Sequence, residues 1–360
     1  MSKMNDLEAM VEISFIIPAY NSEHVIRRCI ESVVSDAEQT AANYEVIIVE
    51  NGSTDSTFLL ANDLSKKHKS VKVLRSKKGV SKARNRGILE SKGRIIVFLD
   101  ADDLLLPGAA NTILSDWKHF GTDLIQYAYL KDEKKILHKY SPLAAKINDN
   151  TLEDVKAWFI RRPTLRMQAW GKAFNGELVR NKRIMFDEDL VYSEDSEFVI
   201  RYLKEIKSIV ISNSIIYRYC TDFPSAMRSY NSNKAENYIK SLSKSRDFLA
   251  LESGIISDAF REYVLINLNV ILVNEVFSKY TDQSFWKRLK EMKKILNRRI
   301  FHDNIEHIKT SRLLTIQLLP ELFFKNNLNL AGGIICYIKA CINKAHYGYK
   351  NRLIPKGARV

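Results

Sequence analysis

The sequence predicts an α/β protein with a doubly wound, mostly parallel sheet, followed by a helical C-terminal region. Over the first 120 residues, short apolar runs alternate with helical segments at the spacing of βα units. These runs are continuously apolar, which is typical of parallel strands covered on both faces. From about residue 234 onward, the apolar residues recur at helical spacing instead, for example at Phe285, Leu289, Met292 and Leu296.

The elements follow in order along the chain. We expect strands at 13–18, 44–50, 71–74 and 94–100, and helices at 23–35, 55–68 and 80–91. Pro107 suits the first turn of another helix, and further strands and turns follow over 124–217. We therefore predict an N-terminal extension at 1–11, an α/β domain at 12–225 and a helical region at 226–360.

Composition narrows the class of protein. The 360 residues are 46% hydrophobic and 27% charged, which excludes an intrinsically disordered chain. The four cysteines show no paired metal spacing, so a reducing cell interior is the simplest expectation. We see neither a secretory signal nor an apolar run that could span a bilayer, and a cytoplasmic location is predicted.

The net charge of +14 is unevenly distributed. The last 36 residues, from Lys325 to Val360, contain seven Lys or Arg and no Asp or Glu. Such a tail is suited to binding an anionic surface, either nucleic acid or a membrane leaflet.

Polar clusters follow three of the predicted strands, where doubly wound sheets bind their ligands. The clusters are Pro18-Ala19-Tyr20-Asn21, Glu50-Asn51-Gly52-Ser53 and Asp100-Ala101-Asp102-Asp103. A tight turn and a helix cap explain Ser53 to Asp55 without any function. Three carboxylates after a buried strand repel one another, and a hard divalent cation, Mg²⁺ or Mn²⁺, would offset that repulsion. Helix capping or a solvated turn is the alternative for each Asp taken alone.

Such cations usually bridge to a substrate diphosphate, yet the chain has neither a P-loop nor a dinucleotide-binding glycine motif. Four segments, "ISFIIPAYNSE", "IIVENGSTDST", "GVSKARNRGI" and "IIVFLDADD", resemble in order and spacing the family 2 glycosyltransferases of GT-A fold. The resemblance is strong over residues 12–120 and weaker over 165–203. It implies a Rossmann-like GT-A domain that uses a metal ion and a nucleotide-diphosphate sugar, and that inverts the anomeric centre.

The resemblance also implies roles on the donor side. Pro18, Ala19 and Tyr20 match the loop that lines the base pocket, and Asn51 matches the position that binds the nucleobase. The family often has two Asp where this chain has Glu50 and Asn51, so the identity of the base, expected to be uracil, stays open. Asp100 and Asp102 match the DxD motif of the family. Asp102 and Asp103 match the carboxylates nearest the ribose and the metal. Arg84 matches an arginine beside the nucleotide. A surface charge is the alternative for Arg84.

The acceptor side is expected in two further segments. An inverting transfer needs a base for the acceptor hydroxyl, and "SEDSEF" supplies Glu194 and Asp195. The resemblance assigns the base to Asp195, whereas capping by Ser193 or Asp195 is the structural alternative. Trp170 and Lys172 in "AWGK" resemble the acceptor segment of bacterial relatives, although Trp170 fits a buried core position equally well.

These observations predict a sugar transferase of bacterial surface-polysaccharide synthesis, with a nucleotide-sugar donor and a glycan or lipid-linked acceptor. A metal-dependent nucleotidyltransferase is the alternative, and a basic nucleic-acid-binding protein is disfavoured because its carboxylate cluster would repel a polyanion. We expect no nucleic-acid partner, and we predict peripheral contact with the inner face of the plasma membrane. The basic side chains expected at anionic lipid are Lys339, Lys344, Lys350, Arg352, Lys356 and Arg359. Packing of this region against the α/β domain is the alternative.

Overall fold

The computed structural model describes residues 10–137, 143–145, 149–221, 234–249, 254–278 and 283–353, with the side chains of 143–145, 149–151 and 344–353 outside the description. The chain divides into two compact units. The first contains residues 1–156 and 164–227, and the second contains 157–163 and 228–360. The predicted division at residues 225 and 226 falls outside the described residues.

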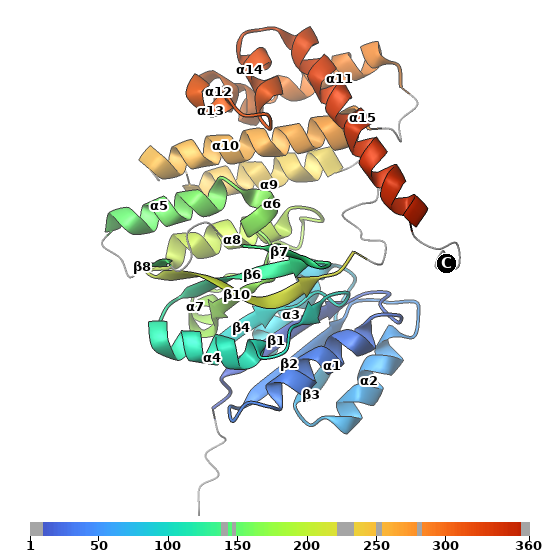
Figure 1. The fold of residues 1–360 in the computed structure, drawn as a ribbon, viewed down its shortest axis with the longest axis vertical. Helices are drawn as coiled ribbons and strands as arrows, with labels where there is room; N and C mark the ends of the chain where they lie inside the picture. Colours follow the sequence, from blue (N-terminus) through green and yellow to red (C-terminus); the bar gives the residue numbers. More distant parts are fainter. Residues whose placement is uncertain are drawn as a thin grey trace, which may run out of the picture. The chain divides into compact units, whose positions relative to one another are not determined.

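The first unit is built on one twisted sheet (Figure 1). Its strands run in the order β3-β2-β1-β4-β9-β6-β10-β5. Their bounds are β1 Ile13–Ala19, β2 Tyr44–Glu50, β3 Val71–Arg75, β4 Ile95–Phe98, β5 Leu104–Leu105, β6 Leu124–Lys131, β9 Lys172–Asn175 and β10 Ile209–Tyr219. Two short strands lie off this path: β7 Lys134–Ile136 pairs with β6, and β8 Leu143–Ala145 pairs with β10.

The strands β1 to β4 are parallel to their neighbours within this group, as the continuous apolar runs predict. β1 lies between β2 and β4, with Ala19 opposite Glu50 and Ile16 opposite Phe98. β9 then pairs antiparallel with both β4 and β6, which makes the sheet mixed. Because β1, β2 and β4 end at the same edge, their polar clusters meet there.

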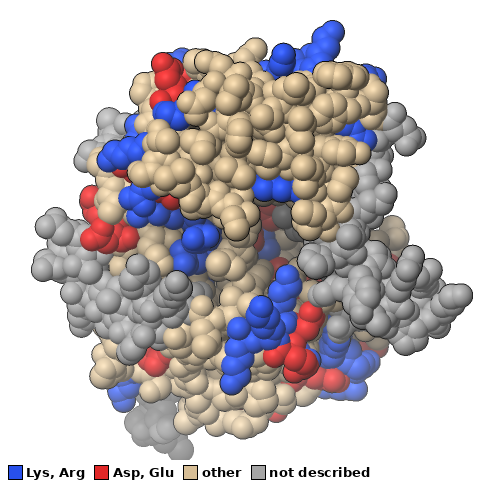
Figure 2. All heavy atoms as spheres, turned by 45° about the horizontal axis from the view of Figure 1, so that its top comes forward, with Lys and Arg blue, Asp and Glu red and all other residues tan. Residues whose placement is uncertain are grey.

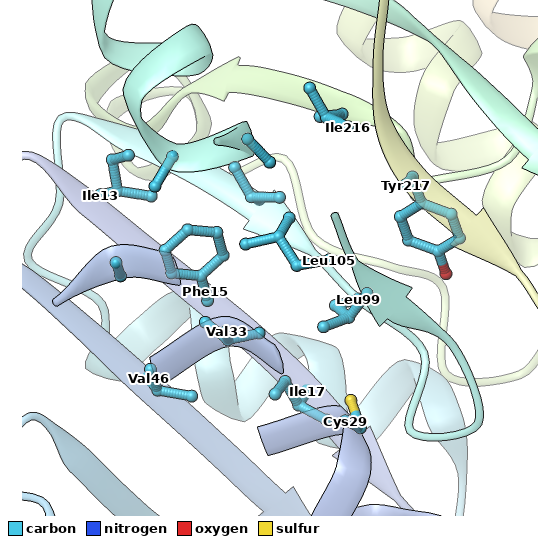
Figure 3. Close-up of a cluster of buried hydrophobic side chains, with 14 of the residues drawn as sticks. Ile13, Phe15, Ile17, Cys29, Val33, Val46, Leu99, Leu105, Ile216 and Tyr217 are labelled. Carbon is cyan, nitrogen blue, oxygen red and sulfur yellow. The ribbon is translucent and has the colours of Figure 1, made fainter. Parts of the chain in front are cut away.

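Helices cover both faces of the sheet. α1 (Ile26–Ala37), α2 (Thr57–Lys67) and α4 (Ala109–Phe120) bury their apolar sides against the face that carries Phe15 and Ile17. Figure 3 shows Cys29 and Val33 of α1 near these two side chains. α3 (Val80–Glu90), α7 (Gly176–Asn181) and α8 (Glu194–Glu205) lie on the other face. There Gly87 approaches so closely that a Cβ would sit 2.4 Å from the Ile16 side chain, which only glycine permits.

The second unit is helical, as predicted from residue 234 onward. Its helices are α9 Lys234–Leu249, α10 Gly254–Ile271, α11 Phe285–Leu296, α12 Arg299–His307, α13 Thr310–Leu313, α14 Leu319–Lys325 and α15 Asn329–Leu353, and a π-helical stretch at Leu272–Val276 extends α10. Two helices, α5 (Asp149–Ile160) and α6 (Pro163–Arg166), cross the division between the units. Within the described residues, no helix combines the length and apolarity needed to cross a bilayer.

The predicted strands and helices of the first 100 residues are confirmed to within a few residues. The largest difference is at α1, which begins at Ile26 rather than at residue 23. Its predicted first turn is instead a loop, because the Ser22 N–H donates to Thr57 Oγ1 at 2.7 Å and the Glu23 N–H donates to Asp55 Oδ2 at 3.1 Å. These bonds tie the loop after β1 to the start of α2.

Candidate active site

The ends of β1 and β2 form one wall of the site. The Asn51 N–H donates to the Ala19 carbonyl at 3.0 Å, and the Thr54 N–H donates to Asn21 Oδ1 at 2.9 Å. Asn21 adopts a left-handed φ of 45°, which Asn tolerates better than most residues. The two predicted base-binding loops are therefore fastened to each other before any ligand binds.

Glu50 and Asn51 are buried, with 5% and 4% of their surfaces exposed. The Glu50 carboxylate accepts a hydrogen bond from the Ser53 N–H and lies 3.7 Å from Arg75 Nε. These contacts, together with those of Asp55 to the Thr57 N–H, agree with a structural role for the turn at Ser53 to Asp55. Glu50 shapes the loop, and Asn51 lies at its base.

Tyr20 stands at the mouth of this wall and is 38% exposed. Lys78 donates from Nζ to the Tyr20 hydroxyl at 2.7 Å and lies 4.6 Å from the centre of its ring. The guanidinium carbon of Arg75 lies 3.6 Å from the centre of the Phe58 ring. Phe58 follows the same loop in the sequence. Lys78 and Arg75 were not among the residues predicted for the site, although the basic run "RSKKG" before the start of α3 is a signal for an anion-binding edge.

The strand-end acids Asp100, Asp102 and Asp103 have different surroundings. Asp103 is fully buried, where its carboxylate accepts a hydrogen bond from the Tyr217 hydroxyl and one from the Cys220 N–H at 2.7 Å. Burial raises the pKa of Asp103 to about 8, and the neighbouring Asp100 and Asp102 add to that shift. Asp103 therefore anchors the turn to β10, and these contacts favour a structural role over its predicted role at the metal.

Asp100 and Asp102 are both half-buried. The Asp102 backbone carbonyl accepts a hydrogen bond from Arg28 at 3.0 Å, which fixes the turn from the side of α1. Within the described residues, no group of three or more His, Cys, Asp or Glu is arranged to hold a metal ion. Mg²⁺ and Mn²⁺ with a nucleotide need only one or two carboxylates, since the diphosphate and water complete the shell. The carboxylates of Asp100 and Asp102 fit that requirement.

Arg84 connects the strand-end acids to the acidic pair on α8. Its side chain is only 3% exposed, so a surface charge is excluded for this arginine. The guanidinium donates to Asp195 Oδ1 at 2.6 Å, to Asp100 Oδ1 at 3.0 Å and to Glu194 Oε1 at 3.2 Å. The carboxylates of two distant chain segments thus share one cation.

The start of α8 presents the acidic pair. Ser193, the residue before the helix, has a left-handed φ of 64° and makes no side-chain cap hydrogen bond. Asp195 does not cap the helix either, since its carboxylate oxygens accept hydrogen bonds from Arg84 and from the Ala169 N–H at 3.2 Å. The capping alternative therefore lacks the hydrogen bonds that it requires.

The segment from Gln168 to Lys172 lies against Asp195. The Lys172 ammonium is fully buried, donates to the Gln168 carbonyl at 2.6 Å and is influenced by the charge of Asp195. Trp170 is 7% exposed and stacks on Tyr217 at 4.6 Å between ring centres. Both residues therefore support the site from within, and their predicted contact with an acceptor stays a prediction.

Burial shifts the protonation of the site. It raises the pKa of Asp100 to about 6, against the lowering effect of Arg84. Burial also raises the pKa of Glu194 to about 8, and the adjacent Asp195 adds to the shift. Burial alone would lower the pKa of Arg84, but the three carboxylates together raise it, so Arg84 stays charged. Perturbed groups gathered at a strand edge are typical of catalytic sites.

Comparisons with known proteins agree with this architecture. The model of glycosyl transferase family 2 matches residues 14–177. The chain is 26% identical over 220 residues to an uncharacterized glycosyltransferase, EpsJ, of Bacillus subtilis, an alignment that covers 58% of this chain and 60% of EpsJ. It is 28% identical over 247 residues to the poly(ribitol-phosphate) beta-N-acetylglucosaminyltransferase TarP of Staphylococcus aureus, covering 65% of this chain and 71% of TarP.

Among solved structures, the chain is similar to S. aureus TarS 1-349 in complex with UDP, with a TM-score of 0.64 and 18% identity. That superposition covers 94% of this chain and 92% of TarS 1-349. The fold is therefore a GT-A fold, followed by a helical region. Residues 14–177, which make up most of the α/β unit, are thus similar to glycosyl transferase family 2, and the named relatives are glycosyltransferases.

Proposed function

We propose that the protein transfers a sugar, with inversion, from a UDP-sugar to a hydroxyl of a glycan or lipid-linked acceptor in surface-polysaccharide synthesis. The observation that carries this proposal is the shared contact of Arg84 with Asp100 and Asp195. A glycosyl transfer requires the donor diphosphate and the acceptor base to lie within a few ångströms of the anomeric carbon. One guanidinium joins the residues proposed for these two tasks.

The donor fits the wall formed by β1 and β2. Tyr20 offers a half-exposed ring for the base, and Asn51 offers both a donor and an acceptor to the edge of a uracil. Lys78, held over the Tyr20 ring, places a positive charge at the same edge. TarS has been solved with UDP and with UDP-GlcNAc, which supports a uridine nucleotide for a chain of the same fold.

Asp102, with Asp100 beside it, would hold a Mn²⁺ or Mg²⁺ ion. When bound, such an ion neutralises the charge that develops on the leaving diphosphate. Arg84 stays protonated and holds Asp100 and Asp195 in place on either side of the reacting centre. The metal role of Asp103 is not part of this proposal, because its two oxygens accept hydrogen bonds from Tyr217 of β10 and from the Cys220 N–H just after that strand.

Asp195 acts as the base in this proposal. It takes the proton of the acceptor hydroxyl while that oxygen attacks the anomeric carbon and the bond to the diphosphate breaks. Its hydrogen bonds with Arg84 and the Ala169 N–H orient the carboxylate. Glu194 is the weaker candidate, because its side chain is 13% exposed, against 20% for Asp195, and is therefore less open to an acceptor.

The acceptor is proposed from the relatives. TarP is named for a reaction on poly(ribitol phosphate), which is a polyanion, and a net charge of +14 suits a polyanionic or membrane-bound acceptor. We propose that the protein works at an anionic membrane surface, where lipid-linked glycans are presented.

The proposal is tested by UDP release. Purified protein is mixed with UDP-glucose, UDP-galactose or UDP-GlcNAc, Mn²⁺ and poly(ribitol phosphate) or a lipid-linked glycan, and products are identified by mass spectrometry. Asp195→Asn should abolish transfer, whereas Asp63→Asn, an exposed acid on α2 paired with Lys66, should not. Pyrophosphate release from a nucleoside triphosphate and a sugar phosphate, without any transfer, would support a nucleotidyltransferase instead.

A further inference from the structure

The helix α15 exposes an apolar face on the second unit. Between Leu330 and Asn343, the exposed residues carry no charge. They are Leu330, Ile334, Tyr337, Ile338, Cys341, Ile342 and Asn343. Leu330, Ile334, Ile338 and Ile342 recur every four residues, so they form one stripe along the helix, each 43% to 55% exposed. A solvent-facing stripe is normally the charged side of a surface helix.

The opposite side of α15 packs into the unit. A Cβ at Gly332 would meet the Phe324 ring at 2.2 Å, and one at Gly333 would meet Leu289 at 2.4 Å. Cys336 is fully buried on the same side. The buried interior of the second unit therefore already uses one side of this helix, and the exposed stripe is a separate surface.

Other exposed apolar residues adjoin the stripe. Trp286 of α11 is 71% exposed and lines one cavity together with Leu330. Lys339 donates to the Gln317 carbonyl at 2.8 Å, which places the turn containing Ile316 beside α15. Ile316 is 88% exposed. We call the stripe with Trp286 and Ile316 the apolar face.

Basic side chains lie beside the apolar face. The cavity next to Trp286 is also lined by Lys290 and Lys293, which are exposed on α11. Over residues 283–343 the chain contains eleven Lys or Arg but four Asp or Glu. Figure 2 shows a broad tan area in its upper half, with both blue and red side chains at its margin.

We infer that the apolar face docks on an anionic lipid leaflet. Apolar side chains that enter the lipid interface next to lysines that meet its headgroups are the two features of a helix lying on a membrane. A second copy of the chain would bring a face with the same excess of cations against these lysines, and the repulsion disfavours that occupant. The stripe lies within the predicted C-terminal tail, of which Lys356 and Arg359 fall outside the described residues, whereas Trp286, Lys290 and Lys293 precede that tail.

This inference deepens the proposed function, since a lipid-linked acceptor requires the enzyme at a membrane. It rests on contacts of the second unit alone, whereas the proposed chemistry rests on the first. Docking is therefore measured without a nucleotide sugar.

The intact protein is titrated with vesicles of phosphatidylglycerol and phosphatidylcholine, and separately with pure phosphatidylcholine. The chain has four tryptophans, of which Trp117 and Trp170 are buried and Trp158 is half-buried. Trp286 therefore reports the contact. We expect a blue shift of its emission and quenching by brominated lipid with the anionic vesicles only, and neither signal in Trp286→Phe.

Two pairs of variants test the apolar and basic parts separately. Ile334→Asp with Ile338→Asp should weaken partitioning at least tenfold, whereas Leu59→Asp with Leu89→Asp, at two more exposed positions of the first unit, should change it less than twofold. Lys290→Glu with Lys293→Glu should weaken it more than about twentyfold, because each basic residue near the leaflet contributes about fivefold. Lys66→Glu with Lys67→Glu is the control for charge.

Circular dichroism verifies the fold of each variant, and if the isoleucine pair fails to fold, the lysine pair keeps the test valid. Equal partitioning of the variants and wild type, equal binding to phosphatidylcholine alone, or a dimer that the isoleucine changes dissociate would overturn the inference. Asp195→Asn should bind vesicles like wild type. Vesicle binding without any sugar transfer would therefore refute the proposed function and leave the docking face standing.

Discussion

Arg84→Met removes the only guanidinium that contacts all three carboxylates of the acid cluster in the described residues. Asp100, Glu194 and Asp195 would then repel one another without a shared cation. Methionine retains much of the aliphatic length that packs near the Phe186 ring, from which the guanidinium carbon is 5.1 Å. The change therefore tests electrostatics more than packing.

The expected loss in the free energy of unfolding depends on how deeply the ion pairs of Arg84 are buried. Removing one partner of a buried ion pair costs about 3–5 kcal/mol. The carboxylate side chains are 31%, 13% and 20% exposed for Asp100, Glu194 and Asp195, so solvent screens part of the repulsion. We expect a loss of about 3 kcal/mol in the free energy of unfolding at about pH 8.

The loss should depend on pH. Without Arg84, the pKa values of Asp100 and Glu194 rise further above about 6 and about 8, and the folded state takes up protons that the unfolded state releases. Stability of the variant then increases as pH falls through these raised values. Wild type shows the same trend more weakly, since Arg84 still pairs with the carboxylates. The gap between the two proteins should therefore shrink toward about pH 5.

Urea unfolding followed by circular dichroism, in EDTA at about pH 5 and about pH 8, measures the gap. Arg86→Met, two residues along the same helix and exposed beside Glu90, is the matched control and should cost less than about 0.5 kcal/mol. A gap that is equal at both pH values, or an equal cost for Arg86→Met, would refute the electrostatic account of Arg84.

Three further predictions follow from individual side chains. Asp195→Asn should lower kcat more than about a hundredfold with UDP-sugar affinity almost unchanged in calorimetry; a collapse of affinity with kcat retained would move the base to Glu194. Asp102→Asn should remove the Mn²⁺ dependence of UDP binding, and a retained dependence would contradict its role. Because burial lowers the pKa of Lys172 to about 7, unfolded Lys172 binds a proton that the folded state lacks between about pH 7 and about 10. The free energy of unfolding should therefore rise with pH over this range. In urea unfolding, Lys172→Met should lower the slope of that free energy against pH by up to about 1.4 kcal/mol per pH unit.

The parallel strands and the meeting of their polar ends could be predicted from the sequence. Ile13 to Ala19 and Ile95 to Phe98 are buried at every position, so the apolar runs carry the information directly. The side of the sheet on which each strand ends follows from parallel pairing. Local pattern therefore sufficed to bring Asn51 and Asp100 to one edge.

The roles within the acid cluster could not be separated in this way. Asp100, Asp102 and Asp103 look alike in sequence, and only the arrival of Tyr217, from β10 more than a hundred residues later, distinguishes Asp103. The same limit applies to Lys172, whose burial depends on the chain around Gln168 and Asp195. A contact between distant segments leaves no periodic pattern to detect.

The region where β4, α3 and α8 meet combines features that lower stability. Ser193 has a left-handed backbone, burial raises the pKa values of Asp100 and Glu194, and Arg84 Nε is buried without a hydrogen-bond partner among the described residues. Apolar residues of similar size would fill such a space with less loss of solvation. Most buried positions along β1 and β4 are apolar, whereas around Arg84 buried charge and a left-handed backbone occur together. Since folded proteins tolerate such combinations mainly where charge and strain serve a reaction, this combination supports placing the chemistry at Arg84 and its three carboxylates.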